Sequence, residues 1–387
     1  MNLTISVSDL AAARKLLTRI RFARLSLPVL NHVLATVDAA GLTLAVTDLD
    51  HWLETRLPAV IEPFAPGRFL IPAEALKAAA AGDKHSHAHF VFEDTPDGPK
   101  LTLTVPCSGM NAVSVHRPEP ADQFPARPSA GGAIAHLPCE TFVALGRVAG
   151  LASTDPTRHV LNGVFFTPDR GGELVATNGR TLALAPVRFS GHPFILPSAA
   201  ARVLVHPDFA TRDAAICQET SDGNVVRVMF RSGPHTLLAK TIEGIYPNYR
   251  QVIPADHTAE AVIPEAHRPG LIAWLRSLSG RRGSVVLRHD RPGQLGITLE
   301  DYDSDSETVS IRVPAAVSGE VPVIAYDPAH FADVLAIGSA LRFTDGMSAT
   351  LLTAPDGTLC VLMPTRCHAS SAIHHATAPP ATHPAAA

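Results

Sequence analysis

A unit in which a short strand leads through a proline or a capping residue into an Ala- and Leu-rich helix recurs six times along the chain. Successive units begin 60–68 residues apart, a spacing regular enough to indicate an internal repeat. Proline is well tolerated at the start of a helix, because its missing N–H would have no partner there. The six predicted units span 3–17, 69–81, 134–148, 194–205, 262–278 and 323–337, with helix starts marked by Ser8, Pro72, Pro138, Pro197, Pro264 and Pro328.

Between the helices, apolar residues alternate with polar ones, as at Leu42, Leu44 and Val46. A period of two predicts sheets with one buried face. The chain has 387 residues, more than a single core usually supports. We therefore pair the six units by twos into an α+β fold of three similar domains. The predicted domains are 1–127, 128–256 and 257–367, followed by a disordered Ala- and Pro-rich tail at 368–387.

Two reverse turns are predicted between residues 160 and 186. The first is the run Pro168-Asp169-Arg170-Gly171-Gly172, and the second is Asn178-Gly179. Asn-Gly readily takes a positive φ at two successive residues, so the chain should reverse there as a tight hairpin. Most turns of this kind only redirect the chain, and the turn alone therefore assigns no function.

Charge argues against a protein that wraps nucleic acid over its whole surface, because the formal net charge is -4. A local cationic surface is nevertheless expected on the first helix. Its segment from Leu10 to Arg24 contains no acidic residue, and such a surface would bind phosphates without sequence preference. A merely solvated helix face is the alternative interpretation. The cations of this segment are Arg14, Lys15, Arg19, Arg21 and Arg24.

The five cysteines include no Cys-x-x-Cys pair, which favours reduced thiols and a cytoplasmic protein. The N-terminal residues do not resemble a signal peptide, and no apolar run is long enough to span a bilayer. The segment His85-Ser86-His87-Ala88-His89 would place three imidazoles on one face of a strand, but no Cys or acidic partner has ligand spacing. Phosphate-binding loops and nucleophile elbows are absent from the sequence. We therefore predict no catalytic residue, metal or cofactor. The third alternative is an enzyme, and it depends only on these histidines.

Several blocks along residues 1 to about 367 resemble, in the same order, the bacterial replicative sliding clamp family, the beta subunit of DNA polymerase III. Each block alone is weak evidence, whereas their common order is strong evidence. The blocks are Leu27-Pro28-Val29-Leu30, Thr47-Asp48-Leu49-Asp50, Arg158-His159-Val160-Leu161-Asn162-Gly163, Ala176-Thr177-Asn178-Gly179, Tyr246-Pro247-Asn248-Tyr249-Arg250 and Met363-Pro364-Thr365-Arg366.

The resemblance implies a head-to-tail homodimeric ring with three similar domains per chain. Helices would face a central hole that holds duplex DNA, and sheets would form the outside. The family has no catalytic activity of its own. It implies as partners the polymerase III catalytic subunit, the clamp loader and other proteins with a clamp-binding motif, and no membrane.

The resemblance also implies a hydrophobic pocket for a short linear motif of these partners. Its walls should be only partly packed, so that mutations there affect binding more than stability. The usual His-Arg after the glycine is here Arg180-Thr181, which indicates altered selectivity. By position, the pocket residues are Arg158, Leu161, Thr177, Gly179, Leu182, Pro247, Val252, Met347, Val361, Met363, Pro364 and Arg366.

The surface expected to face DNA departs further from the family. Glu74 and Ser198-Ala199 stand where basic residues are common, and His159-Val160 replaces aromatic residues. At the expected ring seam, Arg276-Ser277 stands where apolar residues are expected. These differences favour, as an alternative, an accessory clamp with a resistance or decoy role. The predicted DNA-binding residues are Arg14, Arg19, Arg24 and Arg202, of which Arg24 matches a DNA-contacting arginine of the family.

Overall fold

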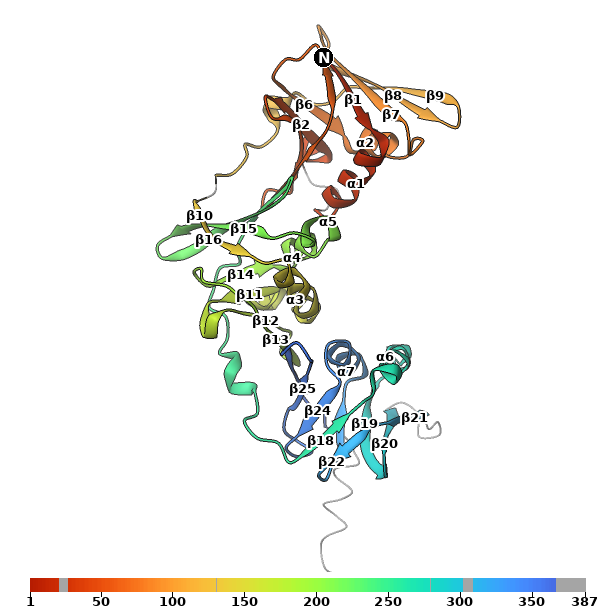
Figure 1. The fold of residues 1–387 in the computed structure, drawn as a ribbon, viewed down its shortest axis with the longest axis vertical. Coiled ribbons are helices and arrows are strands. Elements are labelled where there is room, and N and C mark those ends of the chain that lie inside the picture. The colour runs from red at the N-terminus through yellow and green to blue at the C-terminus, as the bar shows by residue number, and fades with distance from the viewer. Residues whose placement is uncertain (21–26, 130, 279, 302–308, 367–387) are drawn as a thin grey trace, which may run out of the picture. The chain divides into compact units, whose positions relative to one another are not determined.

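The computed structural model describes residues 1–20, 27–129, 131–278, 280–301 and 309–366 (Figure 1). The predicted tail at 368–387 and the predicted DNA contact Arg24 lie outside these residues. The chain forms two compact units. The first consists of residues 1–149, 156–173 and 187–245, and the second consists of 150–155, 174–186 and the chain from 246 onward.

All six predicted strand–helix units are confirmed. Pro72 and Pro197 are the N-caps of their helices, while Pro328 lies in the first turn of its helix, where the Asp327 side chain accepts from the N–H of Ala329 and His330. The first helix was expected to be capped near Ser8; it begins at Val7 with Ser6 as its N-cap. The pairs are β1 (Asn2–Ser6) with α1 (Val7–Leu17), β6 (Gly67–Pro72) with α2 (Ala73–Ala79), β10 (Ala133–Leu137) with α3 (Glu140–Val148), β14 (Phe194–Pro197) with α4 (Ser198–Leu204), β18 (Ala259–Val262) with α6 (Arg268–Ser277), and β23 (Ile324–Tyr326) with α7 (Pro328–Leu335).

The first unit contains two larger antiparallel sheets and the two strands β14 and β11 (Gly163–Thr167), which begin the nine-stranded sheet. The five-stranded sheet has the order β5 (Val60–Glu62), β1, β7 (His87–Thr95), β8 (Gly98–Cys107) and β9 (Met110–His116). The eight-stranded sheet has the order β10, β15 (Ala214–Ser221), β16 (Asn224–Ser232), β17 (His235–Lys240), β4 (His51–Leu57), β3 (Gly41–Thr47), β2 (His32–Asp38) and β6. β11 pairs with β14, and the short α5 (Pro207–Ala210) follows α4.

The eight-stranded sheet is covered on both faces. Helices α1 and α2 pack on one face, against β2, β3 and β4. The other face carries Trp52, Leu238 and Met229 in a buried cluster that Phe124 of the linker completes. The rings of Trp52 and Phe124 meet edge to face with centroids 5.8 Å apart. The linker, residues 117–129 between β9 and β10, therefore packs against the sheet through Phe124.

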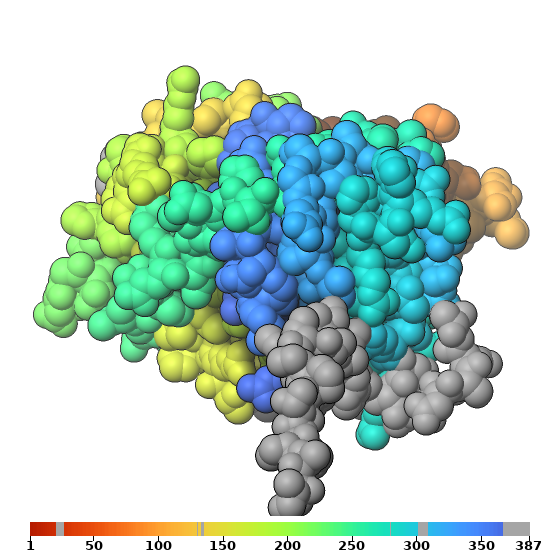
Figure 2. Space-filling model, turned by 90° about the horizontal axis from the view of Figure 1, so that it is seen from below, coloured from red at the N-terminus to blue at the C-terminus, as the bar shows by residue number. Residues whose placement is uncertain are grey.

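The second unit is built on seven consecutive strands and a four-stranded sheet. The seven strands are β12 (Glu173–Thr177), β13 (Thr181–Pro186), β26 (Leu359–Leu362), β25 (Thr350–Thr353), β24 (Ala340–Phe343), β18 and β22 (Ala316–Ser318). The smaller sheet has the order β21 (Val309–Pro314), β20 (Gln294–Asp301), β19 (Gly283–Arg291) and β23. Helices α6 and α7 pack against each other, and the cyan-to-blue residues of this unit form a closely packed surface in Figure 2.

Candidate partner-binding site and cationic surface

The turn between β12 and β13 is held by two side-chain oxygens. Thr177 Oγ1 donates to the carbonyl of Thr181 (2.6 Å) and accepts from the N–H of Gly179 (3.0 Å). Asn178 Oδ1 accepts from the N–H groups of Arg180 and Thr181, both at 2.8 Å. The chain reverses here as predicted, but only Gly179 of the Asn-Gly pair has a positive φ, at 86°. The predicted tight hairpin is therefore present, but its loop has three residues, 178–180, instead of two successive residues with positive φ.

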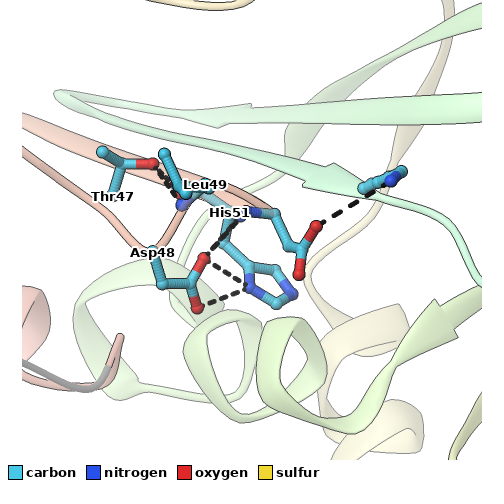
Figure 3. Close-up of polar contacts among 6 residues, drawn as sticks. Thr47, Asp48, Leu49 and His51 are labelled. Atoms are coloured by element: carbon cyan, nitrogen blue, oxygen red, sulfur yellow. Dashed lines mark hydrogen bonds and ion pairs between the residues drawn. The ribbon is translucent and has the colours of Figure 1, made fainter. Parts of the chain in front are cut away.

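The first unit repeats this turn between β3 and β4 (Figure 3). Thr47 Oγ1 donates to the carbonyl of His51 (2.7 Å) and accepts from the N–H of Leu49 (3.0 Å). Asp48 Oδ1 accepts from the N–H groups of Asp50 (3.2 Å) and His51 (2.7 Å). Leu49 has the positive φ of the corresponding glycine, at 80°. The sequence signal for this repeat is a threonine followed by Asp or Asn at the end of a strand.

A related turn places Met347 in the second unit. After β24, Asp345 Oδ1 accepts from the N–H of Met347 (2.7 Å) and of Ser348 (2.6 Å). Hydrogen bonds from the Met347 backbone and then from Ser348 hold the pKa of the Asp345 carboxyl below its usual value. The turn therefore stays tied as a charged Asx turn at neutral pH, with the Met347 side chain 68% exposed.

An apolar floor lies beside the Thr177–Thr181 turn. Leu182 of β13 is directly opposite Val361 of β26, and Val361 is opposite Leu351 of β25. Leu182 is 3% exposed and Val361 is 1% exposed. The expectation that the pocket walls are only partly packed is therefore wrong for these two residues, because sheet neighbours on both sides cover them.

Three other predicted pocket residues are exposed apolar side chains. Val252 is 45% exposed, Met347 is 68% exposed and Met363 is 38% exposed. Met363 is fixed in position because its N–H donates to the carbonyl of Arg180 (2.9 Å), so it continues the β13–β26 pairing up to the turn. Accessible apolar side chains of this kind are available to contact the apolar anchors of a peptide.

The segment that carries Pro247 and Val252 is fastened to β12 by Tyr246. Its hydroxyl donates to the carbonyl of Val175 at 3.4 Å, and its ring meets that of Tyr249 edge to face at 6.4 Å. Burial raises the pKa of Tyr246 well above its ordinary value, so the hydroxyl stays protonated as a donor. The sequence block predicted a site here but did not identify Tyr246 as the residue that fastens it.

The remaining pocket predictions fall in two places. Pro364 and Arg366 follow β26 in the second unit, half-buried and exposed respectively. Arg158 and Leu161 lie on the 3-10 segment Pro156–Leu161 of the first unit. Their assignment to the pocket stays a prediction. Ten of the twelve predicted residues thus belong to one compact unit.

The cationic surface begins at the C-terminal end of α1. Arg14 is half-buried there, and Lys15 and Arg19 are exposed. This end of the helix lies near α5 (Figure 1). Burial lowers the pKa of His206, the N-cap of α5, and the charges of Arg19 and Lys15 lower it further while Asp208 opposes them. The positive charges at the C-terminal end of α1 therefore lower the pKa of a histidine in the middle third of the chain.

The positions that depart from the family have structural roles of their own. Arg202 is exposed on α4, as a DNA contact requires, but Ser198 of the same helix donates its hydroxyl to the carbonyl of Asn162 (2.7 Å). Arg276 of α6 pairs with Asp333 of α7 at 3.7 Å. Burial raises the pKa of Asp333 and Arg276 opposes that shift. The unusual arginine at the expected seam thus has a partner in its own chain.

The histidines do not lie together on one strand. His85 precedes β7 in a turn, whereas His87 and His89 belong to it, and His89 Nδ1 is 2.9 Å from Thr4 Oγ1. Over the described ranges, no group of three or more His, Cys, Asp or Glu residues is placed to hold a metal ion. No described helix is both long and apolar enough to cross a membrane.

Replacing Asp48 with asparagine is expected to remove a pH-dependent part of the stability. Burial raises the pKa of Asp48, but hydrogen bonds and charge from His51 outweigh it, so the pKa is lowered overall. A lowered carboxyl pKa stabilises the fold above the unfolded-state value and loses that effect as the pH falls through the folded-state value. Asn178 holds the equivalent turn, so Asp48→Asn should keep the backbone hydrogen bonds and lose about 1 kcal/mol at pH 7.

Urea unfolding from pH 7 down to about pH 3 measures this effect. The curves of the wild type and of Asp48→Asn should converge at acid pH. Asp38→Asn is the control, since Asp38 also accepts from a nearby backbone N–H, at 2.8 Å, but has no histidine partner in the described part of the chain. A difference between wild type and Asp48→Asn that stays constant with pH would contradict the assignment.

Comparison with known proteins finds beta sliding clamps among the proteins similar to this chain. No protein-family model matches the chain. The chain is 27% identical to the beta sliding clamp of Caulobacter vibrioides over 391 aligned residues, which cover 95% of this chain and 100% of the relative. It is 28% identical to the beta sliding clamp of a Synechocystis species, covering 87% of this chain and 90% of the relative.

Solved structures agree with this similarity. The Caulobacter crescentus beta sliding clamp matches with a TM-score of 0.77 and 25% identity, covering 95% of this chain and 99% of that chain. The beta subunit of the Streptococcus pyogenes DNA polymerase shares the fold, with a TM-score of 0.80 at 16% identity over 95% of this chain and 100% of that chain. Together with the repeated strand–helix units and the collinear sequence blocks, these similarities make beta sliding clamps the proteins that this chain resembles in both sequence and fold.

Proposed function

We propose that the protein is a DNA polymerase processivity factor, a sliding clamp that encircles duplex DNA and tethers the replicative polymerase. The observation that carries this proposal is one order of elements, repeated three times: strand, helix, sheet strands, a second strand–helix unit and a closing set of strands. A beta sliding clamp with the same fold matches over 95% of the chain. This agreement supports the processivity function over the alternative of a resistance or decoy clamp.

We further infer a head-to-tail homodimeric ring, with domains bounded at 1–127, 128–256 and 257–367. The repeated order of elements supports these boundaries. We infer that Arg14, Arg19, Arg24 and Arg202 contact the DNA backbone, and the exposure of Arg19 and Arg202 supports this role. The protein is proposed to be cytoplasmic and non-catalytic.

The partners are proposed to be the polymerase III catalytic subunit, the clamp loader and other proteins that carry a short hydrophobic motif. Exposed Val252, Met347 and Met363 support this inference, because apolar anchors of a peptide need accessible apolar surface. The buried Leu182 and Val361 lie beside the turn that fixes Met363 and form a firm support.

Retention on closed DNA tests the processivity function. We expect protein loaded onto nicked circular DNA by a bacterial clamp loader to stay bound, and to be released when the circle is linearised. Because few cations are available for the DNA, direct affinity should be weak and should depend little on salt. Gel filtration of the loaded DNA measures retention, and light scattering at micromolar concentration measures the oligomer. A monomer, or equal retention on linear DNA with unblocked ends, would contradict the ring.

A further inference from the structure

A cavity of about 410 Å³ opens on the eight-stranded sheet of the first unit. It is lined by three arginines, one glutamate and two threonines: Arg56, Arg127, Arg231, Glu54, Thr43 and Thr236. Small-molecule sites usually have volumes of about 300–1,000 Å³ and mostly apolar walls. This cavity has the volume of such a site but a polar, cationic lining.

The strand register places these side chains on one face of the sheet. Arg231 of β16 is opposite Thr236 of β17, and Thr236 is opposite Glu54 of β4. Arg56 of β4 is opposite Thr43 of β3. Directly opposed residues in antiparallel strands project to the same face. Every second residue shares a face, so this face is the one that carries Trp52.

That face is the one covered by the linker, not by helices. Trp52 belongs to the cluster that Phe124 completes, while α1 and α2 pack against the same strands from the other side. The cavity is therefore separate from the cationic end of α1. A duplex held by the helices would not be its ligand.

One of the three guanidinium groups is already neutralised. Arg127 of the linker binds Glu54 with two hydrogen bonds, Nε to Oε2 and Nη2 to Oε1, both 2.9 Å. The indole N–H of Trp52 also donates to Glu54 Oε2, at 2.8 Å. Burial raises the pKa of Glu54, but the hydrogen bonds from Arg127 and then Trp52 outweigh it and lower the pKa overall. Glu54 is therefore an ionised carboxylate, and both of its oxygens accept hydrogen bonds.

The other two guanidinium groups carry uncompensated charge. Within the described residues, neither Arg56 nor Arg231 has an ion pair or side-chain hydrogen bond in the structure. Their strands are separated by β17 alone, which corresponds to about 10 Å between backbones. Both side chains are exposed, so their charges repel each other only weakly in water and both stay available to an anion in the cavity. The lining carries three positive charges and one negative, a net charge of two positive in a chain whose net charge is -4.

We propose that this cavity binds a small phosphate-bearing anion with two or more negative charges, such as diphosphate or a nucleoside diphosphate. The planar fork of arginine matches phosphate oxygens and donates two parallel hydrogen bonds. Two such groups offset two of the negative charges of a diphosphate, and the hydroxyl of Thr43 adds a donor. The polar lining does not suit the apolar anchors of a clamp-binding peptide.

Isothermal titration of the full chain with diphosphate and with ADP, at constant ionic strength, tests the site. Saturable binding of one ligand per chain is expected. Arg56→Gln and Arg231→Gln should each weaken it by about tenfold or more, and the double variant should show no measurable binding. The control is the double variant Arg117→Gln and Arg188→Gln, which removes two exposed arginines of the same unit from outside the cavity and should bind within about twofold of wild type.

The two ligands separate the sources of the phosphate. Equal affinity means that the phosphates alone are recognised, and tighter binding of ADP means that the cavity also contacts the nucleoside. Either result supports the site if it depends on Arg56 and Arg231. Lack of saturation by millimolar ligand would overturn the proposal, and so would equal weakening in the control variant. Citrate or an acidic peptide that binds as tightly as diphosphate, through the same arginines, would overturn the assignment to phosphate. Thermal unfolding of each variant verifies that the fold is intact.

Discussion

Replacing Leu182 with alanine is expected to lower the free energy of unfolding by about 2–5 kcal/mol. The side chain is 3% exposed and lies opposite Val361, which is itself 1% exposed. Removing the Leu182 side chain leaves a cavity between β13 and β26 that the paired backbones cannot close. The free energy lost with the packing contacts then adds to the free energy lost with the apolar burial. This variant should also bind partner peptide less well, because the Thr177–Thr181 turn and Met363 rest on the same two strands.

Denaturant unfolding measures the loss, with Leu184→Ala as the matched control. Leu184 is on the same strand and is only half-buried, so the same substitution should cost clearly less. A Leu182→Ala variant as stable as the Leu184→Ala variant would show that the apolar floor is less tightly packed than its burial indicates.

Replacing Met363 with alanine is expected to weaken binding of a partner peptide by about 1–3 kcal/mol, as truncation of an anchor contact usually does. Stability should change by less than about 1 kcal/mol, because the side chain is 38% exposed. The position of residue 363 should be kept, since the hydrogen bond to Arg180 uses the backbone.

Calorimetry with a synthetic peptide that carries the clamp-binding motif of a replicative polymerase measures this change. Met110→Ala is the control. Met110 is 71% exposed on β9 of the first unit, and its replacement should leave the affinity for the peptide unchanged. Unchanged affinity in Met363→Ala with the fold intact would remove Met363 from the site. Together with Leu182→Ala, the variant separates the support of the site from its binding surface.

Local sequence signals predicted the strand–helix units well. Proline starts such as Pro197 restrict the backbone at one residue, and alternating or helical apolar patterns act over a few residues. The six units therefore follow from contacts along the chain, and the structure confirms all of them. The turn at Asn178 shows where this reasoning fails. The Asn-Gly pair predicted a reversal, but the hydrogen bonds of Thr177 decided its shape.

Local sequence signals could not predict which side chains of the site are buried and which are exposed. Leu182 and Met363 look alike in the sequence as apolar residues of a pocket, yet one is buried and the other exposed. The difference arises because β13 pairs with β26, a strand almost 180 residues further along the chain, so that Leu182 gains sheet neighbours on both sides. Long-range pairing of this kind has no signature in a window of ten or twenty residues.

The sequence by itself determined the six strand–helix units, the α+β class and the order of the family blocks. Only the tertiary structure decided which of the candidate site residues are accessible, and that Arg127 of the linker binds Glu54 of β4, 73 residues away. It also brought Arg56 and Arg231 to one cavity through the pairing of β16, β17 and β4. The physical reason is range: propensity and turn chemistry act between neighbours in sequence, whereas burial and the meeting of charges depend on which strands pair.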